Sequence, residues 1–374
     1  MRIQRIEPGL WSIAPPGSPT PADADPGLDT AVLEVGGGHL SWSVPAGPQV
    51  PAALLHDLDT AQEWLWALYG AEVAVAADEY TGPVELPARP ERPELAAAVR
   101  RLGYAHWAAR WWPASTVDGI PALDAAELES EIVELSEICE SVVAGADAAI
   151  PAESDEVAES PGGLDAEDTG RAADYALAAG GQRDPQAALV LERGTVGWDW
   201  RYCPPGVVDA SERAVSWELV RAAGANSLRI RAVTAPGLRA EPPEYLRPHA
   251  LIRTPAGDYD AALMLAGDNW TAALAVVAGT VSEVAVYVPG VGPAAPAGTG
   301  SSESTGGGSG PEPRDPATPA ADSWQRARIR EFAHARLRRA ESGPASDAGQ
   351  PTGGLADIAS LRAERTAAER DSDF

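Results

Sequence analysis

Two cysteine thiols and many carboxylates are the side chains of this sequence that could take part in covalent or acid–base chemistry. Cys203 lies in the stretch TVGWDWRYCPPGVVDAS, residues 195–211, which also contains Asp199 and Asp209. A thiol becomes a nucleophile when a nearby histidine or helix N-terminus lowers its pKa, and a pair of carboxylates can act as general acid and base. One hypothesis is therefore a hydrolase with a carboxylate- or Cys203-based site in a cleft between two domains, although the local sequence offers Cys203 neither activating group.

Several other chemistries are excluded by the residue types present. The sequence contains no lysine, which rules out Schiff-base chemistry, pyridoxal phosphate binding through a lysine and a Walker A phosphate-binding loop. The five histidines are scattered singly, and the two cysteines are too few for a structural zinc site. The sequence also contains no GxSxG and no GxGxxG motif. We therefore predict no catalytic residue by motif, no metal site and no cofactor.

The net charge of −27 is concentrated in one region of the chain. Between Ala122 and Tyr175 there are sixteen acidic residues and one basic residue. Nucleic-acid binding depends on cations that neutralise phosphates, so we expect none except through the basic segment 322–341. Arginine as the only long cation, with many alanines, glycines and prolines, is typical of a bacterial genome of high GC content. No apolar run predicts a membrane span or a signal peptide, so we expect a cytoplasmic protein that does not bind membranes.

Changes in composition divide the chain into ordered and flexible segments, and the ordered segments predict an α+β protein. The ordered segments are an N-terminal mixed α+β domain, residues 1–145; an all-β sandwich-like or open-barrel domain, residues 186–289; and a tethered basic helix, residues 322–341. The flexible segments are an acidic linker, residues 146–185; a linker rich in glycine, serine and proline, residues 290–321; and a tail, residues 342–374.

Within residues 1–145, local patterns predict one β-hairpin and several helices. TAVLEV and HLSWSV, joined across three glycines, predict the hairpin, and AEVAVA predicts a strand. Leucines near helical spacing predict a helix after Pro51, and a second helix is predicted over Glu94–Trp112 because Pro113 stops it. Asp124 and Glu127 have capping-box spacing, so they predict a third helix with one apolar face and one acidic face.

Eight short apolar or alternating runs separated by turn signals predict the β-rich domain. These runs are QAALVLER, VGWDWRYC, AVSWELV, LRIRAV, ALIRT, YDAALML, WTAALAVV and EVAVYV. In VGWDWRYC, Trp198 and Trp200 alternate with Asp199 and Arg201, which predicts a half-buried strand with Asp199 and Arg201 on the face open to a partner. Asp209 and Glu212 have capping-box spacing, which predicts a short helical turn.

Residues 32–47 and 190–206 share a Val-Leu-Glu-x-Gly sequence, a later tryptophan and a proline–glycine ending. The similarity is short, and two interpretations remain open. Either two unrelated hairpins match by chance, or both descend from one strand–turn–strand unit. Cys203 has no counterpart in the first segment.

The segment SWQRARIREFAHARLRRA, residues 323–340, predicts a basic amphipathic helix with a narrow apolar stripe. We expect its side chains to contact a protein partner, and the residues predicted for this role are Arg326, Arg328, Ile329, Arg330, Phe332, Arg336 and Leu337. Trp107, Arg110 and Trp111 form a second candidate, because a tryptophan pair beside an arginine can anchor a partner; plain core packing is the alternative.

These features favour a non-enzymatic adaptor or regulatory subunit of a bacterial multi-protein system. Partners would be recruited through the tethered arginine-rich helix and the acidic helix, since a flexible tether keeps a binding helix near its target. Two alternatives remain for the arginine-rich helix. It could fold back on the acidic helix of the same chain as a latch, or it could bind nucleic acid.

Overall fold

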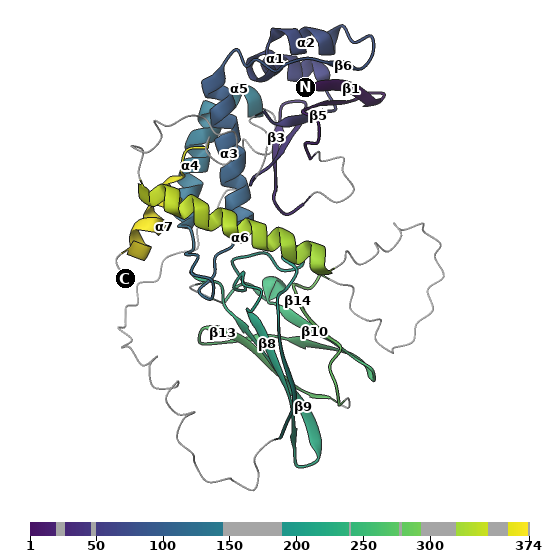
Figure 1. The fold of residues 1–374 in the computed structure, drawn as a ribbon, viewed down its shortest axis with the longest axis vertical. Helices are drawn as coiled ribbons and strands as arrows, with labels where there is room; N and C mark the ends of the chain where they lie inside the picture. Colours follow the sequence, from purple (N-terminus) through teal and green to yellow (C-terminus); the bar gives the residue numbers. More distant parts are fainter. Residues whose placement is uncertain are drawn as a thin grey trace.

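The structure is a computed structural model that describes residues 1–19, 27–45, 50–144, 189–238, 241–276, 279–292, 319–342 and 358–372. The fold is α+β, as predicted, with an N-terminal half of sheet and helices, a β-rich half and a long C-terminal helix (Figure 1). In the part of the chain that is described, no helix combines the length and apolar character needed to cross a membrane. The predicted linker 146–185 and most of 290–321 lie outside the described residues.

The N-terminal half contains an antiparallel sheet with the strand order β3-β4-β5-β2-β1-β6. Its strands are β1 (Arg2–Glu7), β2 (Leu10–Ala14), β3 (Thr30–Val35), β4 (Gly38–Ser43), β5 (Ala52–Leu55) and β6 (Val84–Glu85). The predicted hairpin is β3–β4, which closes tightly because Gly37 adopts φ +82° and a Cβ there would lie 2.3 Å from the Asp57 carbonyl oxygen.

The helix predicted after Pro51 forms but begins later than its leucine pattern indicates, and the strand predicted at AEVAVA is wrong. The leucine pattern after Pro51 begins in a strand, because Leu54 and Leu55 belong to β5, and helix α1 (Leu58–Tyr69) starts only after Asp57 caps it. AEVAVA forms helix α2 (Ala71–Asp78) instead of a strand. Its alanines favour a helix, and Val73, Ala74 and Ala77 are buried at helical spacing, which the valine alternation concealed.

The remaining helices of this half follow the predicted pattern. Helix α3 (Pro93–Trp111) ends before Pro113, and Asp124 caps α4 (Ala125–Ile138) by accepting hydrogen bonds from the backbone amides of Ala126 and Glu127. Cys139 joins α4 to the short helix α5 (Glu140–Val143).

The β-rich half consists of two antiparallel sheets that share one core. The larger sheet has the order β12-β13-β9-β8-β7 and the smaller one β11-β10-β14. The strands are β7 (Leu189–Val196), β8 (Val215–Ala222), β9 (Ala225–Val233), β10 (His249–Thr254), β11 (Gly257–Ala262), β12 (Met264–Ala266), β13 (Asn269–Val276) and β14 (Glu283–Tyr287). A 3-10 turn, η2 (Glu244–Leu246), precedes β10. Inward side chains such as Ile230 and Ile252 lie in the same buried cluster.

The stretch VGWDWRYC is not a strand beyond Val196, so this prediction is wrong. The Asp199 carboxylate accepts a hydrogen bond from the Arg201 amide at 3.0 Å, and the Asp199 carbonyl accepts one from the Tyr202 amide, which folds the chain into a turn. Trp198 and Trp200 are both buried, and Trp198 Nε1 donates to the Asp209 carbonyl. Alternation in the sequence therefore reflects two tryptophans inserted into the core from a loop.

The turn predicted after Asp209 is a single hydrogen-bonded turn, in which the Ala214 amide donates to the Ser211 carbonyl, and no helix follows Asp209. The Asp209 carboxylate accepts hydrogen bonds from the Ser211 amide, the Ser115 hydroxyl at 2.6 Å and the Thr116 amide at 2.7 Å. Asp209 therefore joins the β-rich half to the loop after α3. Residues 32–43 run through the hairpin β3–β4, whereas the segment from Val190 passes from β7 into the tryptophan turn, so the two similar segments do not form a common unit.

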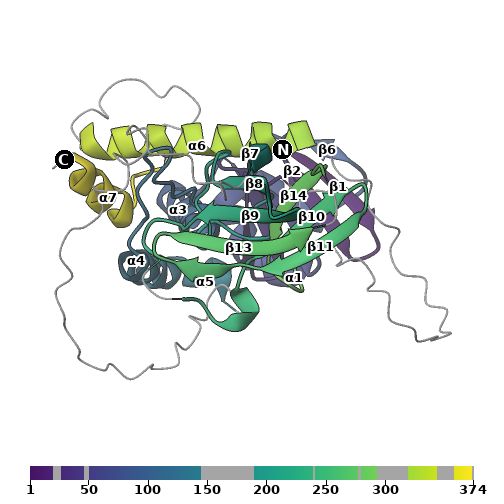
Figure 2. The same cartoon turned by 90° about the horizontal axis from the view of Figure 1, so that it is seen from below.

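Two helices complete the described chain. The predicted helix 322–341 is α6 (Pro319–Ser342), and it lies across both halves, as Figures 1 and 2 show. Residues 362–372 of the predicted flexible tail form a further helix, α7 (Arg362–Ser372), which packs on α4 and α6. Its apolar side consists largely of alanines, which give a weak sequence signal but are buried here.

Candidate functional site

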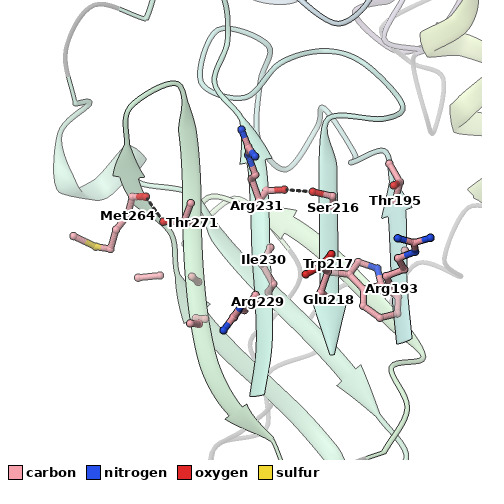
Figure 3. Close-up of a pocket in the computed structure, with 15 residues that line it drawn as sticks. Arg193, Thr195, Ser216, Trp217, Glu218, Arg229, Ile230, Arg231, Met264 and Thr271 are labelled. Carbon is pink, nitrogen blue, oxygen red and sulfur yellow. Dashed lines mark hydrogen bonds between the residues drawn. The ribbon is translucent and has the colours of Figure 1, made fainter. Parts of the chain in front are cut away.

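An open groove lies on one face of the five-stranded sheet and has a volume of about 1090 Å³ (Figure 3). We call the outward side chains of this groove the open face. They are Arg193 and Thr195 of β7, Ser216 and Glu218 of β8, Arg229 and Arg231 of β9, Met264 of β12, and Thr271 and Ala273 of β13. All are exposed or half-buried.

Alternation along β8 and β9 creates this open face. Leu228, Ile230 and Ala232 are buried, whereas Arg229 and Arg231 between them point outward. The strand register then places Arg193 opposite Glu218 and Glu218 opposite Arg229. One row consequently crosses β7, β8 and β9, with one arginine on each side of a central glutamate.

A second row of the open face carries hydroxyl groups. The register aligns Thr195, Ser216, Arg231 and Thr271 across four strands. The Ser216 hydroxyl donates to the Arg231 carbonyl at 3.4 Å, and the Thr271 hydroxyl donates to the Met264 carbonyl at 3.4 Å (Figure 3). Because the serine and threonine side chains are short, they do not project far from the sheet. A bound molecule could therefore approach the arginines closely.

Strand β7 is an edge of the larger sheet, and Gly194 at its centre permits close packing. A Cβ at Gly194 would lie 2.7 Å from the Trp217 ring, so only glycine lets the ring cover the strand. At the start of β7, Leu189 and Val190 are 61% and 47% exposed. Among the described strands β7 is the last of this sheet, so the open face continues to a strand edge that carries apolar side chains.

The apolar residues predicted as partner contacts on α6 are buried within the chain. Ile329, Phe332 and Leu337 are at most 6% exposed. The Phe332 ring meets Tyr104 and Trp107 edge-to-face, at centroid distances of 5.9 and 6.0 Å. The apolar stripe of α6 therefore completes the core beside α3.

The arginines predicted on α6 are likewise engaged by carboxylates of this chain. Arg326 pairs with Glu212 at 2.6 Å, Arg330 reaches Glu212 at 3.2 Å, and Arg328 lies 3.4 Å from Asp29. Glu212 precedes β8, whereas Asp29 precedes β3. Helix α6 thus binds both halves by ion pairs.

Arg336 forms the most buried ion pair, with Glu364 of α7 at 2.6 Å. The Tyr104 hydroxyl donates to Glu364 at 2.5 Å, and burial, with the Glu364 charge, raises the pKa of Tyr104. Side chains of α3 and α6 therefore meet at one buried carboxylate of α7.

Helix α7 contacts part of the acidic face of α4. Glu131 of α4 is 3% exposed, pairs with Arg101 and accepts a hydrogen bond from the Arg362 amide at 2.7 Å. Glu134 pairs with Arg362 at 3.0 Å. The latch hypothesis named the wrong helix, because α7 contacts this acidic face and α6 binds elsewhere.

The tryptophan candidate divides into a core residue and a surface pair. Trp107 is buried, and its Nε1 donates to the Leu28 carbonyl at 2.9 Å. The Arg110 guanidinium lies 5.5 Å from the ring centroid of Trp111, which is half-buried. Asp199 and Arg201, also predicted as partner contacts, pair with each other at 3.0 Å.

A smaller polar cleft of about 540 Å³ lies where α6 meets the β-rich half. It contains Asp118, Glu212, Arg213, Arg330 and His334. Arg330 is held between Asp118 at 3.5 Å and Glu212 at 3.2 Å, so the carboxylates of this cleft are neutralised by arginine.

The thiol and carboxylate of the hydrolase hypothesis are buried. Cys203 is 0% exposed, and burial raises the pKa of its thiol to about 12, which disfavours the nucleophilic thiolate. Asp209 is 0% exposed and is occupied by hydrogen bonds from the 115–117 loop. The described residues also contain no group of three or more histidine, cysteine or carboxylate side chains arranged to hold a metal ion.

The comparisons with known proteins found no matching family model, no curated protein and no solved structure of significant similarity. The open face was not predicted from the sequence. The alternation of arginine with apolar residues in LRIRAV was the available signal, but it indicates only that both arginines share one strand face.

Proposed function

We propose that this chain is a non-enzymatic adaptor or regulatory subunit of a bacterial multi-protein system, and that a protein partner binds the open face. The observation that supports this proposal is the groove of about 1090 Å³ over β7, β8, β9 and β13. Exposed binding surfaces on rigid strands are common sites of partner recognition.

The burial of Cys203 and Asp209 favours this role over the hydrolase hypothesis, because neither side chain can reach a substrate without local opening. Two unpaired buried thiols also suit a reducing compartment, which supports placing the protein in the cytoplasm.

Helix α6 has a supporting role in this proposal. For α6 to recruit a partner itself, Ile329 and Phe332 would have to leave the core, and Arg326 would have to leave Glu212. We propose instead that α6 fixes the two halves and presents the open face as a rigid surface.

Site-specific photocrosslinking tests this function. A photoreactive phenylalanine analogue replaces Ala273, which is exposed on β13, in the full chain expressed in its own bacterial cells. Irradiation should produce a protein adduct of higher mass. The matched control places the analogue at exposed Glu72 of α2, where no adduct is expected.

A second variant carries the analogue at Thr195 of β7. If neither position yields an adduct while the chain is folded, the proposed function is wrong. Circular dichroism of each purified variant establishes that the substitution leaves the fold intact.

A further inference from the structure

The open face carries a local excess of positive charge on a strongly acidic protein. It presents Arg193, Arg229 and Arg231 against one carboxylate, Glu218, whereas the whole chain has a net charge of −27. Charges in solution interact over a screening length of about 10 Å at 0.1 M salt, so distant acidic residues of the chain contribute little to binding at this face.

Two of the three arginines have no carboxylate within ion-pair distance among the described residues. Arg193 and Arg229 lie across the ladder from Glu218, yet no ion pair joins them to it, and both are exposed. Arg231 is held by a hydrogen bond from its Nε to the Asn269 side-chain oxygen at 2.7 Å. The guanidinium groups of Arg193 and Arg229 are therefore available to an anionic ligand.

The arrangement of these groups suits an extended chain. Neighbouring strands are spaced about 4.8 Å apart, so Arg193 on β7 and Arg229 on β9 are separated by about 10 Å at the backbone. Alternate side chains of an extended peptide repeat every 7 Å or so, a spacing that flexible arginines can meet. Ala273 and Met264 offer apolar contacts at one end of the face.

We propose that the open face binds an acidic segment of a partner protein in an extended conformation, with carboxylates against Arg193 and Arg229. This inference rests on the proposed function and adds the chemistry of the partner. Guanidinium groups bind carboxylates through paired hydrogen bonds, which gives geometric selectivity as well as charge attraction.

Nucleic acid fits this face less well than an acidic peptide. The central Glu218 repels phosphates, and the groove's aromatic residue, Trp217, packs its ring over Gly194 and is half-buried. Single-stranded nucleic acids require exposed rings for base stacking and a continuous basic path for the backbone.

Fluorescence anisotropy with the full-length chain tests the inference. The probe is a labelled eight-residue peptide that alternates glutamate with valine, and the comparison is the same peptide with glutamine in place of glutamate. The acidic peptide should bind at least tenfold more tightly, and binding should weaken as salt is raised from about 50 to about 300 mM.

Three variants locate the binding. The double variant Arg193→Gln with Arg229→Gln should weaken acidic-peptide binding by about tenfold, which corresponds to about 1.4 kcal/mol shared between two surface ion pairs. Glu218→Gln should strengthen binding by about threefold, which cannot arise from misfolding. Arg338→Gln, at an exposed position of α6, is the matched control and should bind like the unaltered chain.

Equal binding of the two peptides, or unchanged binding by the double variant, overturns the inference. Tighter binding of a single-stranded DNA oligonucleotide than of the acidic peptide overturns it in favour of a nucleic-acid ligand. If Ala273 crosslinks to a protein while the acidic peptide does not bind, the proposed function stands and only the acidic chemistry of the partner is wrong.

Discussion

Arg336 of α6 and Glu364 of α7 form an ion pair of 2.6 Å in which the two side chains are 2% and 0% exposed. Glu364 also accepts hydrogen bonds from the Tyr104 hydroxyl and from the Leu361 amide. Every oxygen of this carboxylate is thus occupied, which is the condition under which a buried ion pair is tolerated. The last helix is consequently fixed to α3 and α6 through one side chain.

Replacing Glu364 with glutamine should lower the free energy of unfolding by about 3–5 kcal/mol, because Arg336 is left as a buried charge without its counter-ion. Urea denaturation followed by circular dichroism measures the change. Arg338→Ala, at an exposed position of α6, is the control and should change the stability by less than about 0.5 kcal/mol. Equal stability of the two variants would show that the pair is dispensable.

Asp209→Asn should destabilise the protein by about 2 kcal/mol, because the carboxylate accepts charge-assisted hydrogen bonds from Ser115 and Thr116 across the junction of the two halves. Asp268→Asn, on an exposed turn, is a matched control with no expected effect. Hydrogen exchange should locate the loss of protection in the 115–117 loop. Unaltered exchange there would contradict this role of Asp209.

Neither cysteine should react with an alkylating reagent at pH 8 while the protein is folded. Burial raises the pKa of Cys139 and of Cys203 to about 12, so the reactive thiolate is scarce and shielded. Mass spectrometry after iodoacetamide treatment should detect an unmodified native protein and two modifications in urea. Rapid native modification of Cys203 would revive the hydrolase hypothesis.

His106 should make stability depend on pH in mildly acidic solution. Burial lowers its pKa below the ordinary value, so the unfolded chain takes up a proton first as the pH falls. The stabilising contribution is complete above about pH 6.5 and is lost as the pH falls from there toward the folded-state pKa. His106→Gln should therefore lose less unfolding free energy than the unaltered chain between pH 7.5 and pH 5.5.

Urea denaturation at each pH checks the His106 prediction. Between pH 7.5 and pH 8.5 the variant and the unaltered chain should change in parallel, which serves as the internal control. A parallel change below pH 6.5 as well would mean that His106 does not carry this dependence.

The sequence predicted the elements whose signals are local. The β3–β4 hairpin depends on adjacent glycines, and α3 and α4 depend on a stop proline and a capping aspartate. Most strands of the β-rich half also agree with their alternation. These features need only neighbouring residues to form, so composition and spacing indicate them.

The remaining errors arise from contacts between distant residues. AEVAVA alternates like a strand, but Val73, Ala74 and Ala77 are buried at helical spacing when α2 packs beside α1. Trp198 and Trp200 alternate too, yet Asp199 forms a turn and Trp198 donates to the Asp209 carbonyl. The predicted partner residues of α6 find their partners in Glu212, Asp29 and Glu364, which no local pattern links to them.

Helix α7 contacts α3 although the two helices are far apart in the sequence, and this affects folding during synthesis. The Tyr104–Glu364 hydrogen bond joins residues 260 positions apart, so a ribosome adding about 5–20 residues per second completes α3 well before it reaches α7. During that interval of tens of seconds the nascent α3 and α4 lack the cover that α7 provides. The N-terminal half therefore gains the Tyr104–Glu364 hydrogen bond and the cover of α7 only after residue 364 has been synthesised.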